Sequence, residues 1–571
     1  MIRYAAEASA GVFIIIFSLL TSPGADLREK ISGFFSRSGQ TENRQPQKSY
    51  WVRTAVVLTC FAFVLFYKVT EIPVPYNVDE AGTTYDALSL LHYGVDRYLY
   101  KNPVYFINFG GGQSALYTYL TVLTCRLLGY SVLSVRLPAV IFSLVSALCF
   151  AHLMRKRSGE NAAVLSLALF CMVPFSLMHS RWGLDAFLLF PMLIISCTAL
   201  HEAVTTQKKG MFLLSGILLG ITLYTYAISY IFLPLFLTLL LPYLIKSKKI
   251  SRSRLFALGI PLFLLAVPLM LMLAVNRGLI SEIRTSLFSI PRLPVYRRGE
   301  ISFGNIPAYF RLSRDNIFYR LLINDRLAFN TIPRFGTLFH FNLPFIILGF
   351  ILCMRNGICP SSEEDFPIDF MILCAFFSAL FTSLLVKDVN MNKANEIYFP
   401  LIWFLCSGIV NLLQKKRTAC ILTLAFCAFL SGSFLHYYFT GFPAAVERSW
   451  EFSSVDDLKA ALDFANTIEK ERKQVFIIGR DEPYINTLLA LEIDPYSFSE
   501  GKRMNGSNVT GLNNYEFMRQ MKWSGIPENP VYIYRDITDI PWVMDSAGME
   551  TKDFGTMRVY YAPGFRDEST Q

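Results

Sequence analysis

Two adjacent carboxylates, Asp79 and Glu80, are the residues of this sequence best suited to chemistry. They lie in the stretch PYNVDEAGTTYDALSLL, which begins shortly after an apolar run that ends at Val69. An ionisable side chain this close to a membrane span needs water or a partner, and it usually has a functional role. Asp79 could take a proton from an acceptor hydroxyl while a lipid-linked leaving group stays in the bilayer. The structural alternative is that Asp79 caps the helix that follows it.

Glu80 could orient the acceptor or act as the ligand of a divalent cation such as Mg²⁺ or Mn²⁺. No nucleotide cofactor is expected, because the glycine pattern of dinucleotide-binding folds follows none of the predicted strands. The glycine-rich stretch NFGGGQS (108–114) is only a weak candidate for a phosphate cradle, since it precedes a predicted surface helix at 114–129. The acidic pair is therefore the main candidate for catalysis.

Arg181, in the turn HSRWGLDAF, is a candidate substrate-binding residue. An arginine at the membrane surface can bind phosphate through two parallel hydrogen bonds. The structural alternative is that it reaches toward the interface or pairs with Asp185. His179, in the same turn, has no spaced histidine or carboxylate partner, so it is interpreted as a packing residue rather than a metal ligand.

The segment KDVNMNKANEIYFP holds a second group of candidates that is expected on the same side of the membrane as Asp79. Amide groups suit sugar hydroxyls and ammonium groups suit phosphate. The alternative is a solvated turn. The candidates from this segment are Lys387, Asn390, Asn392, Lys393 and Asn395, with Asn330, Asp325 and Arg334 of an earlier loop as weaker ones.

The elements that must position these residues are membrane helices. The chain has 571 residues, of which 53% are hydrophobic and 17% charged, whereas soluble domains have about 25% charged residues. Apolar runs of roughly 17–20 residues recur, the length that crosses a bilayer. The expected fold is a polytopic α-helical membrane protein with about eleven spans, or twelve if residues 1–24 also cross. The predicted spans are 54–71, 135–154, 161–178, 185–203, 211–226, 228–245, 255–275, one that ends at Arg355, 368–386, 396–413 and 418–436.

Basic clusters support this topology, because they all fall on one side when the spans are counted, as the positive-inside rule requires. They are Arg155 to Arg157, Lys208-Lys209, Lys246 to Arg254 and Lys415 to Arg417. Short clusters between spans argue against a nucleic-acid partner despite the formal charge of +10. The eleven cysteines show no CxxC pair or zinc spacing, so they are interpreted as buried apolar residues.

Three regions are predicted. Residues 1–53 comprise an interfacial helix or extra span and a basic cytoplasmic segment, and residues 54–437 form the membrane domain with outside loops at 72–133 and 276–337. Residues 440–571 change character and read as a small α/β domain outside the membrane. Its signals are the amphipathic stretch VDDLKAALDFANTIEKERKQVFIIG and the strand candidates PVYIYRDI and MRVYYAPG.

The order of these features resembles the GT-C type of membrane glycosyltransferases. The stretches YNVDEAGTTYDALSLLHYG, LYTYLTVLTCRLLGYSVLSVRLPAVIFSLVSALCFAHLMRKR and VPFSLMHSRWGLDAF are similar to the dolichyl-phosphate-mannose protein mannosyltransferase and aminoarabinose transferase group, family 39 and its bacterial relatives. The resemblance covers roughly 54–245 and continues more loosely toward residue 410.

The resemblance implies a polyprenyl-phosphate sugar donor, an acceptor that is a glycan, lipid or protein, and inversion at the anomeric carbon. It places the general base on Asp79, with Glu80 as its neighbour. In the mechanism that we predict, Arg181, a lysine such as Lys387 or Lys393, or a divalent ion stabilises the leaving polyprenyl phosphate. The chain departs from the aminoarabinose transferases, which have a Lys-Pro pair where this sequence has Gly112-Gln113-Ser114. That departure puts the donor-phosphate contact in doubt.

Two other functions stay open. A transporter or flippase of lipid-linked sugars would fit the span count, but not the large outside loops or the shortage of charges within spans. A non-catalytic envelope scaffold of GT-C fold would fit the missing Lys-Pro pair. The glycosylation sequons in NGSNVT (505–510) are discounted, because the short loops and cysteine usage favour a bacterial plasma membrane.

Overall fold

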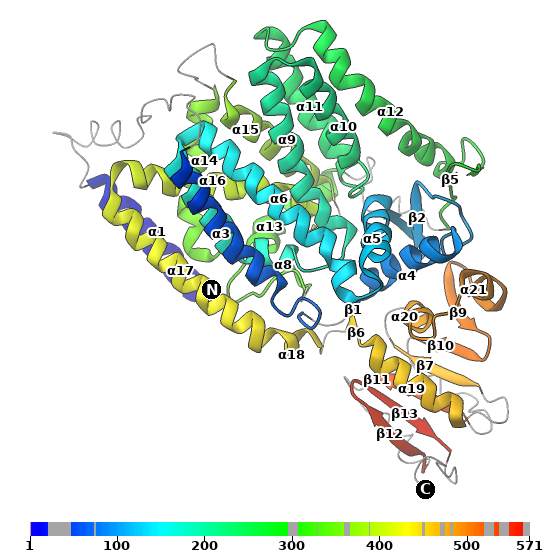
Figure 1. Ribbon diagram of the computed structural model, residues 1–571. Coiled ribbons are helices and arrows are strands. Elements are labelled where there is room, and N and C mark those ends of the chain that lie inside the picture. Colours follow the sequence, from blue (N-terminus) through cyan, green and yellow to red (C-terminus); the bar gives the residue numbers. More distant parts are fainter. Residues whose placement is uncertain are drawn as a thin grey trace. The chain divides into compact units, whose positions relative to one another are not determined.

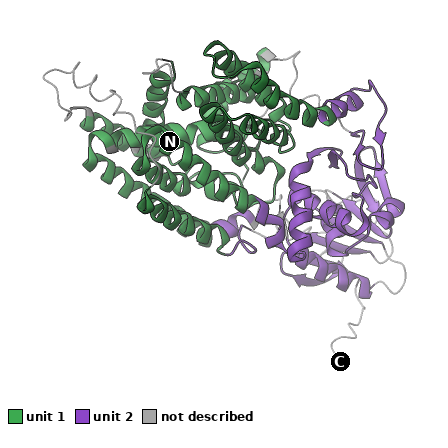
Figure 2. Ribbon diagram, turned by 45° about the horizontal axis from the view of Figure 1, so that its top comes forward, with its two compact units in different colours: residues 1–67, 139–268, 298–440 green, residues 68–138, 269–297, 441–571 purple. Residues whose placement is uncertain are grey.

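The computed structural model describes residues 2–20, 47–73, 76–294, 306–327, 329–358, 366–386, 389–447, 452–468, 474–479, 483–518, 530–535 and 548–562. The chain forms two compact units (Figure 2). Unit 1 comprises residues 1–67, 139–268 and 298–440, and unit 2 comprises residues 68–138, 269–297 and 441–571. The first predicted outside loop, the start of the second and the C-terminal region thus belong to one unit.

Unit 1 is a helical bundle (Figure 1). Its long helices are α1 (Ile2–Leu20), α3 (Lys48–Phe66), α6 (Val132–Ser158, which begins in unit 2), α9 (Leu189–Thr206), α11 (Ser229–Lys246), α12 (Arg252–Asn276, which ends in unit 2), α13 (Ile306–Leu322), α14 (Leu343–Ile358), α15 (Ile368–Leu385), α16 (Tyr398–Lys415) and α17 (Arg417–Thr440). Shorter ones are α7 (Glu160–Met172), α8 (Pro174–His179), η1 (Asp185–Leu188), α10 (Lys209–Thr222), η3 (His340–Asn342) and η4 (Asn392–Ile397).

Nine helical segments among the described residues are long and apolar enough to cross a membrane. They match nine of the predicted spans and confirm a polytopic helical membrane protein. The other two predicted spans correspond to α7 and α10, which have 13 and 14 residues. Large apolar side chains such as Phe63 (69% exposed) and Phe256 (66%) point away from the bundle, as expected for a lipid-facing surface.

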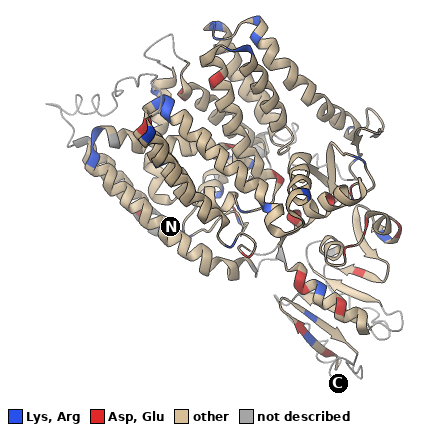
Figure 3. Ribbon diagram, in the orientation of Figure 1, with Lys and Arg blue, Asp and Glu red and all other residues tan. Residues whose placement is uncertain are grey.

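The segment from η4 into α16 lies at the centre of the bundle. Its most apolar window is completely buried, whereas that of α3 or α12 is only 22% buried. Many lysine and arginine positions of the bundle lie near helix ends (Figure 3), and Arg155, Lys156 and Arg157 are in the last turn of α6. The distribution of lysine and arginine predicted from the sequence is therefore present in the described helices.

Unit 2 combines residues 68–138 and 269–297 with the C-terminal α/β region. Its helices are α4 (Val78–Tyr93), α5 (Ala115–Leu128), α18 (Phe442–Glu447), α19 (Val455–Ile468), α20 (Pro483–Ala490) and α21 (Pro495–Gly501). Three two-stranded ribbons pair β1 (Tyr76–Asn77) with β6 (Phe452–Ser453), β2 (Tyr105–Asn108) with β3 (Gly111–Ser114), and β4 (Ile283–Arg284) with β5 (Ser289–Ile290). The predicted surface helix at 114–129 exists as α5.

A seven-stranded sheet has the order β12-β13-β11-β7-β10-β9-β8. Its strands are β7 (Val475–Ile478), β8 (Lys502–Asn505), β9 (Asn508–Leu512), β10 (Tyr515–Met518), β11 (Val531–Arg535), β12 (Glu550–Phe554) and β13 (Met557–Tyr561). β7 pairs in parallel with β10 and β11, and the other pairs are antiparallel. The predicted helix and the strands at 475, 531 and 557 confirm an α/β region, while β8 to β10 and β12 were not predicted.

Candidate functional site

Helix α4 begins with a capping box that involves three residues of the acidic motif. The side chain of Asn77 accepts a hydrogen bond from the Asp79 amide at 2.8 Å, and the Glu80 side chain accepts one from the Asn77 amide at 3.1 Å. The helix cap is therefore Asn77, and the sequence-based alternative that Asp79 caps this helix is wrong. Asp79 lies in the first turn, where a negative charge is stabilised by the helix dipole.

Glu80 forms a buried ion pair with Arg136, which lies near the start of α6. Arg136 Nε donates to Oε1 at 2.9 Å and Nη2 donates to Oε2 at 3.0 Å, and both side chains are completely buried. Arg136 Nη1 also donates to the Val69 carbonyl. Both oxygens of Glu80 thus have strong donors. The predicted role of Glu80 as a metal ligand gains no support from this geometry, and the described residues include no cluster of three metal-ligating side chains.

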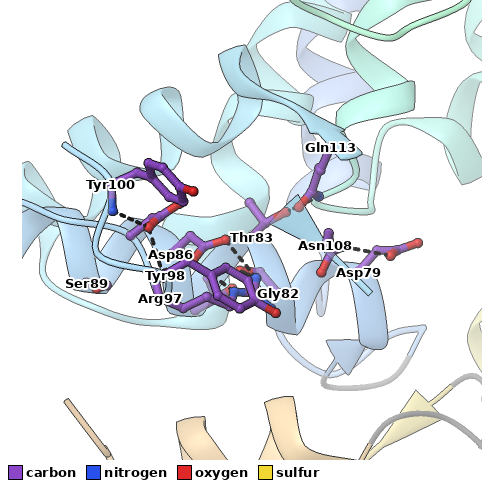
Figure 4. A network of polar contacts seen from close by, with 12 residues as sticks. Asp79, Gly82, Thr83, Asp86, Ser89, Arg97, Tyr98, Tyr100, Asn108 and Gln113 are labelled. Carbon is purple, nitrogen blue, oxygen red and sulfur yellow. Dashed lines mark hydrogen bonds and ion pairs between the residues drawn. The ribbon is translucent and has the colours of Figure 1, made fainter. Parts of the chain in front are cut away.

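Asp79 has a different environment, because its side chain is half-buried rather than completely buried. Asn108 Nδ2 of β2 donates to Asp79 Oδ1 at 3.2 Å (Figure 4). Asn108 lies close against α4 at Gly82, where a β-carbon would come within 2.8 Å of Asn108 Oδ1. The arrangement holds one oxygen of a partly accessible carboxylate, as a general base requires.

A second contact ties the β2–β3 ribbon to α4 one turn further along the helix. Gln113 Nε2 donates to Thr83 Oγ1 at 2.7 Å. Asn108 and Gln113 lie on one face of the ribbon, since Phe106 pairs with Gln113 and Asn108 with Gly111. The stretch Gly112-Gln113-Ser114, where the sequence departs from the aminoarabinose transferases, therefore includes an amide that fixes the ribbon to the acidic-motif helix.

Arg97 is the buried centre of the network in Figure 4. Its guanidinium donates to both oxygens of Asp86, from Nε at 2.9 Å and from Nη2 at 2.7 Å, and Nη2 also donates to the Gly82 carbonyl. Next to it, Asp96 accepts hydrogen bonds from the amides of Tyr98 and Tyr100, while burial raises the pKa of Asp96 to about 7. The sequence analysis did not identify the contacts of Asn108, Arg136, Asp86 and Arg97. Arg136 could have been singled out, because it is a charged residue at the start of an apolar run.

In unit 1, Arg181 has a structural role at the end of α3. It donates to the carbonyls of Val64, Leu65 and Tyr67 at 2.8 Å each, and its guanidinium lies over the ring of Phe439. These carbonyls have no partner within the helix, so Arg181 completes its C-terminal end. The Asp185 carboxylate accepts from the Ala186 amide in the next helix, η1. The predicted phosphate contact of Arg181 stays a prediction.

Two of the predicted loops meet in unit 1 at Asp325. Its Oδ2 accepts from Asn330 Nδ2 at 2.5 Å and from the amide of Met391 at 3.2 Å, and Oδ1 accepts from the Leu327 amide. Burial raises the pKa of Asp325 to about 6, although these donors act in the opposite direction. The Asp325 loop and the segment before η4, predicted as separate candidates, are thus one polar cluster.

Buried oxygens without a hydrogen-bond partner concentrate in this part of unit 1. Among the described residues they include Oδ1 of Asn330, Asn392 and Asn395 and both carboxylate oxygens of Glu396. Asn395 Nδ2 donates to the Ala186 carbonyl at 2.6 Å, which fixes the orientation of its amide and joins η4 to the Arg181 turn. A native fold has few unsatisfied buried polar atoms, so such a group indicates a place for hydrogen-bond donors.

The remaining predicted residues fall into three cases. Asn390 accepts from the Lys393 amide at 3.0 Å and therefore shapes the turn before η4. Lys393 is half-buried, and Lys387 lies outside the described residues. Glu396 was missed because the sequence around a carboxylate in an apolar span does not indicate whether that carboxylate is buried or has a hydrogen-bond partner.

The sequence profile of the dolichyl-phosphate-mannose-protein mannosyltransferase family matches residues 113–272. The resemblance to GT-C type glycosyltransferases is confirmed over that segment. The segment is less than a third of the chain and begins after Asp79 and Glu80, so the roles of these two residues rest on their geometry. A search of curated protein sequences finds no matching relative.

Three solved structures are similar to this chain in their overall arrangement. A crystal structure of ArnT from Cupriavidus metallidurans bound to undecaprenyl phosphate is similar at 11% identity and a TM-score of 0.48, covering 90% of this chain and 98% of ArnT. The Archaeoglobus fulgidus oligosaccharyltransferase is similar at 10% identity and a TM-score of 0.45, covering 77% and 61%. Arabinosyltransferase EmbB from Mycobacterium smegmatis is similar at 12% identity and a TM-score of 0.34, covering 78% and 45%.

Proposed function

We propose that this protein is a glycosyltransferase that moves a sugar from a polyprenyl-phosphate donor to a hydroxyl of a glycan, lipid or protein. The observation that supports it best is that the two carboxylates of the acidic motif have different environments. Glu80 and Asn77 build the helix start, and Asp79 keeps a half-buried carboxylate held on one oxygen by Asn108. A general base needs this combination of fixed position and access to its proton donor.

The proposed reaction is a direct displacement. Asp79 removes the proton of the acceptor hydroxyl, the hydroxyl oxygen forms a bond to the anomeric carbon, and the bond from that carbon to the phosphate oxygen breaks. Polyprenyl phosphate leaves with the bonding electrons, and the anomeric configuration inverts. A membrane enzyme suits this chemistry, because the donor and the released carrier both stay in the bilayer.

The buried oxygens of Asn330, Asn392, Asn395 and Glu396 in unit 1 are proposed to bind hydroxyl groups of the transferred sugar. These unpartnered amide and carboxylate oxygens accept hydrogen bonds, and sugar hydroxyls donate them. Lys387, Lys393 and Arg181 remain the proposed contacts for the donor phosphate, because fixed cations stabilise the charge that develops on a leaving phosphate. A divalent cation would serve the same purpose, and the described carboxylates give it no defined site.

We infer a bacterial plasma membrane as the location, with the acidic motif and the C-terminal region outside.

The test of the proposed activity is release of polyprenyl phosphate by purified protein from a panel of polyprenyl-phosphate-linked sugars and candidate acceptors. We expect the wild type to release it and Asp79→Asn to lose about 10²–10⁴-fold in rate, the usual worth of a general base.

Asp463→Asn is a matched control for this experiment, because Asp463 is an exposed carboxylate on α19 in the same unit. Its release rate should equal that of the wild type. Equal rates for wild type and Asp79→Asn would overturn the assignment of the base. A wild type without release on the whole panel would count against the transferase and favour a flippase or an envelope scaffold.

A further inference from the structure

The acidic-motif helix α4 is attached to the C-terminal region of unit 2 at four places. Tyr76 and Asn77, just before α4, pair with Ser453 and Phe452 of β6. In the middle of the helix, the Tyr85 hydroxyl donates to the Ile493 carbonyl at 2.6 Å. One apolar core contains Ala81 and Tyr85 of α4 together with residues of α19, α20 and the sheet. The helix that holds Asp79 is therefore packed on the C-terminal region rather than on its own loop alone.

The fourth attachment is polar and passes through Arg97. Arg97 is completely buried, it binds Asp86 and the Gly82 carbonyl of α4, and its Nη1 donates to the hydroxyl of Tyr484 at 3.3 Å. Tyr484 belongs to α20, and its ring stacks on Phe498 and meets Phe109 edge-on. The ring thus has an apolar packing role, while its hydroxyl has a separate role toward the guanidinium.

Gly82 of α4 is a common neighbour of Arg97 and of Asn108, the residue that holds the proposed base (Figure 4). Arg97 Nη2 and Asn108 Oδ1 both lie against Gly82, at 3.0 and 2.8 Å from the position where a β-carbon would stand. Asn108 in turn donates to Asp79. A displacement of the guanidinium would therefore change the space beside Gly82 that Asn108 occupies.

We propose that Tyr484 is a positioning residue for Asp79, and that it acts through Arg97, Gly82 and Asn108. This inference rests on the proposed function, and it assigns the C-terminal region a role in fixing the catalytic helix. Two physical arguments support it. A hydrogen bond to a charged group in a buried site is stronger than a neutral one. A small misplacement of a catalytic group lowers the rate strongly, because the reacting atoms must be closely aligned.

The test compares Tyr484→Phe with the wild type in two measurements on the full-length protein in detergent. Phenylalanine keeps the ring and removes only the hydroxyl. Hydrogen–deuterium exchange should become about threefold or more faster in peptides that cover residues 78–93, since one attachment of α4 is lost. In the release assay, kcat should fall about three- to tenfold while KM stays within about twofold, because alignment and not substrate binding has changed.

Tyr515→Phe is the matched control. Tyr515 is a buried tyrosine of β10 in the same unit, and its hydroxyl donates to Asn466 Oδ1 at 2.9 Å. It should leave exchange in 78–93 and kcat unchanged. Unchanged exchange in Tyr484→Phe, or an equal increase in both variants, would overturn the proposal. The exchange measurement needs no substrate, so it judges the positioning role even if no donor is turned over and the proposed function fails.

Discussion

Asp79 and Glu80 are neighbours in the sequence, but their side chains meet different partners in the structure. Glu80 pairs with Arg136 inside the protein, and Asp79 meets Asn108 at a half-buried position. A buried charge that loses its partner is strongly unfavourable, whereas a partly exposed one is solvated. Substitutions at the two positions should therefore fail in different ways.

We expect Glu80→Gln to destabilise the protein by about 3–5 kcal/mol, because it leaves the buried Arg136 guanidinium without its counter-charge. The backbone amide of Asn77 also loses the charged acceptor to which it donates in the capping box. Thermal unfolding in detergent would measure the effect. Asp79→Asn serves as the comparison and should unfold near the wild-type temperature; a Glu80→Gln protein as stable as Asp79→Asn would show that the ion pair contributes little.

The raised pKa of Asp325 predicts that folding stability depends on pH in the opposite direction to that expected for most carboxylates. Its pKa is raised by burial to about 6, so the folded protein holds a proton there that the unfolded chain releases near pH 4. Folding stability from this group is present below about pH 4 and falls as the pH rises to about 6, by about 3 kcal/mol.

The measurement is denaturant or thermal unfolding of wild type and Asp325→Asn between pH 4 and pH 7. The difference in stability between them should shift in favour of Asp325→Asn as the pH rises, because the amide does not ionise. A difference that is constant with pH would contradict the raised pKa.

At this scale the sequence identifies candidate residue types but not their partners. Asp79 and Glu80 stand out because they lie beside an apolar run, and Asn330, Asn390 and Asn392 stand out by their expected side of the membrane. Nothing local to Glu80 indicates Arg136, which is 56 positions away. The same holds for the contact between Asp325 and Met391, which joins two loops.

At the scale of elements, the start of α4 and the β2–β3 ribbon depend on close approach. Gly82 brings Asn108 and Arg97 against the helix, and at Gly112 a β-carbon would overlap the ring of Tyr105, 1.7 Å from its Cε1. Both contacts exclude any larger residue without movement of the ribbon. The glycines of this region are thus requirements of packing.

We expect Gly82→Ala to weaken the hold of Asn108 on Asp79, because the added methyl group would come within 2.8 Å of Asn108 Oδ1. Alanine favours a helix over glycine by about 1 kcal/mol, so the helix itself should not be lost. The release assay should therefore show a loss of about tenfold or more in kcat with little change in the unfolding temperature.

The matched control is Gly210→Ala in α10, where a β-carbon meets nothing within 4 Å. It should retain full activity. A Gly82→Ala protein as active as this control would show that the ribbon moves away without harm to Asp79.

Helices and strands were predictable wherever the hydropathy pattern of the sequence determines the type of element. Nine predicted spans have long apolar helices, and α19 and three strands of the C-terminal sheet follow their amphipathic or β-branched patterns. β8 was not predictable, because Lys502, Arg503 and Asn505 have low β propensity and an exposed pattern. Such an edge strand is held by its partner β9, which the local sequence does not indicate.

At the scale of the whole molecule, the alternation of basic clusters predicts which parts face the cytoplasm. A cysteine introduced at Asn505 should react with a membrane-impermeant maleimide on intact cells, whereas one at Lys209 should react only after lysis. Both positions are exposed, and the eleven native cysteines would first be replaced. Labelling of Lys209→Cys on intact cells would invert the topology and remove the basis for an extracytoplasmic active site.

The contact between Tyr85 and Ile493 joins positions 408 residues apart in the chain. At a synthesis rate of about 5–20 residues per second, roughly 20–80 seconds separate the appearance of the two segments at the ribosome. During that interval α4 has already been made, but the core that covers Ala81 and Tyr85 has not. The helix of the acidic motif can therefore complete its packing only after the C-terminal region has been synthesised, and a chain stalled before that point would leave Ala81 and Tyr85 uncovered.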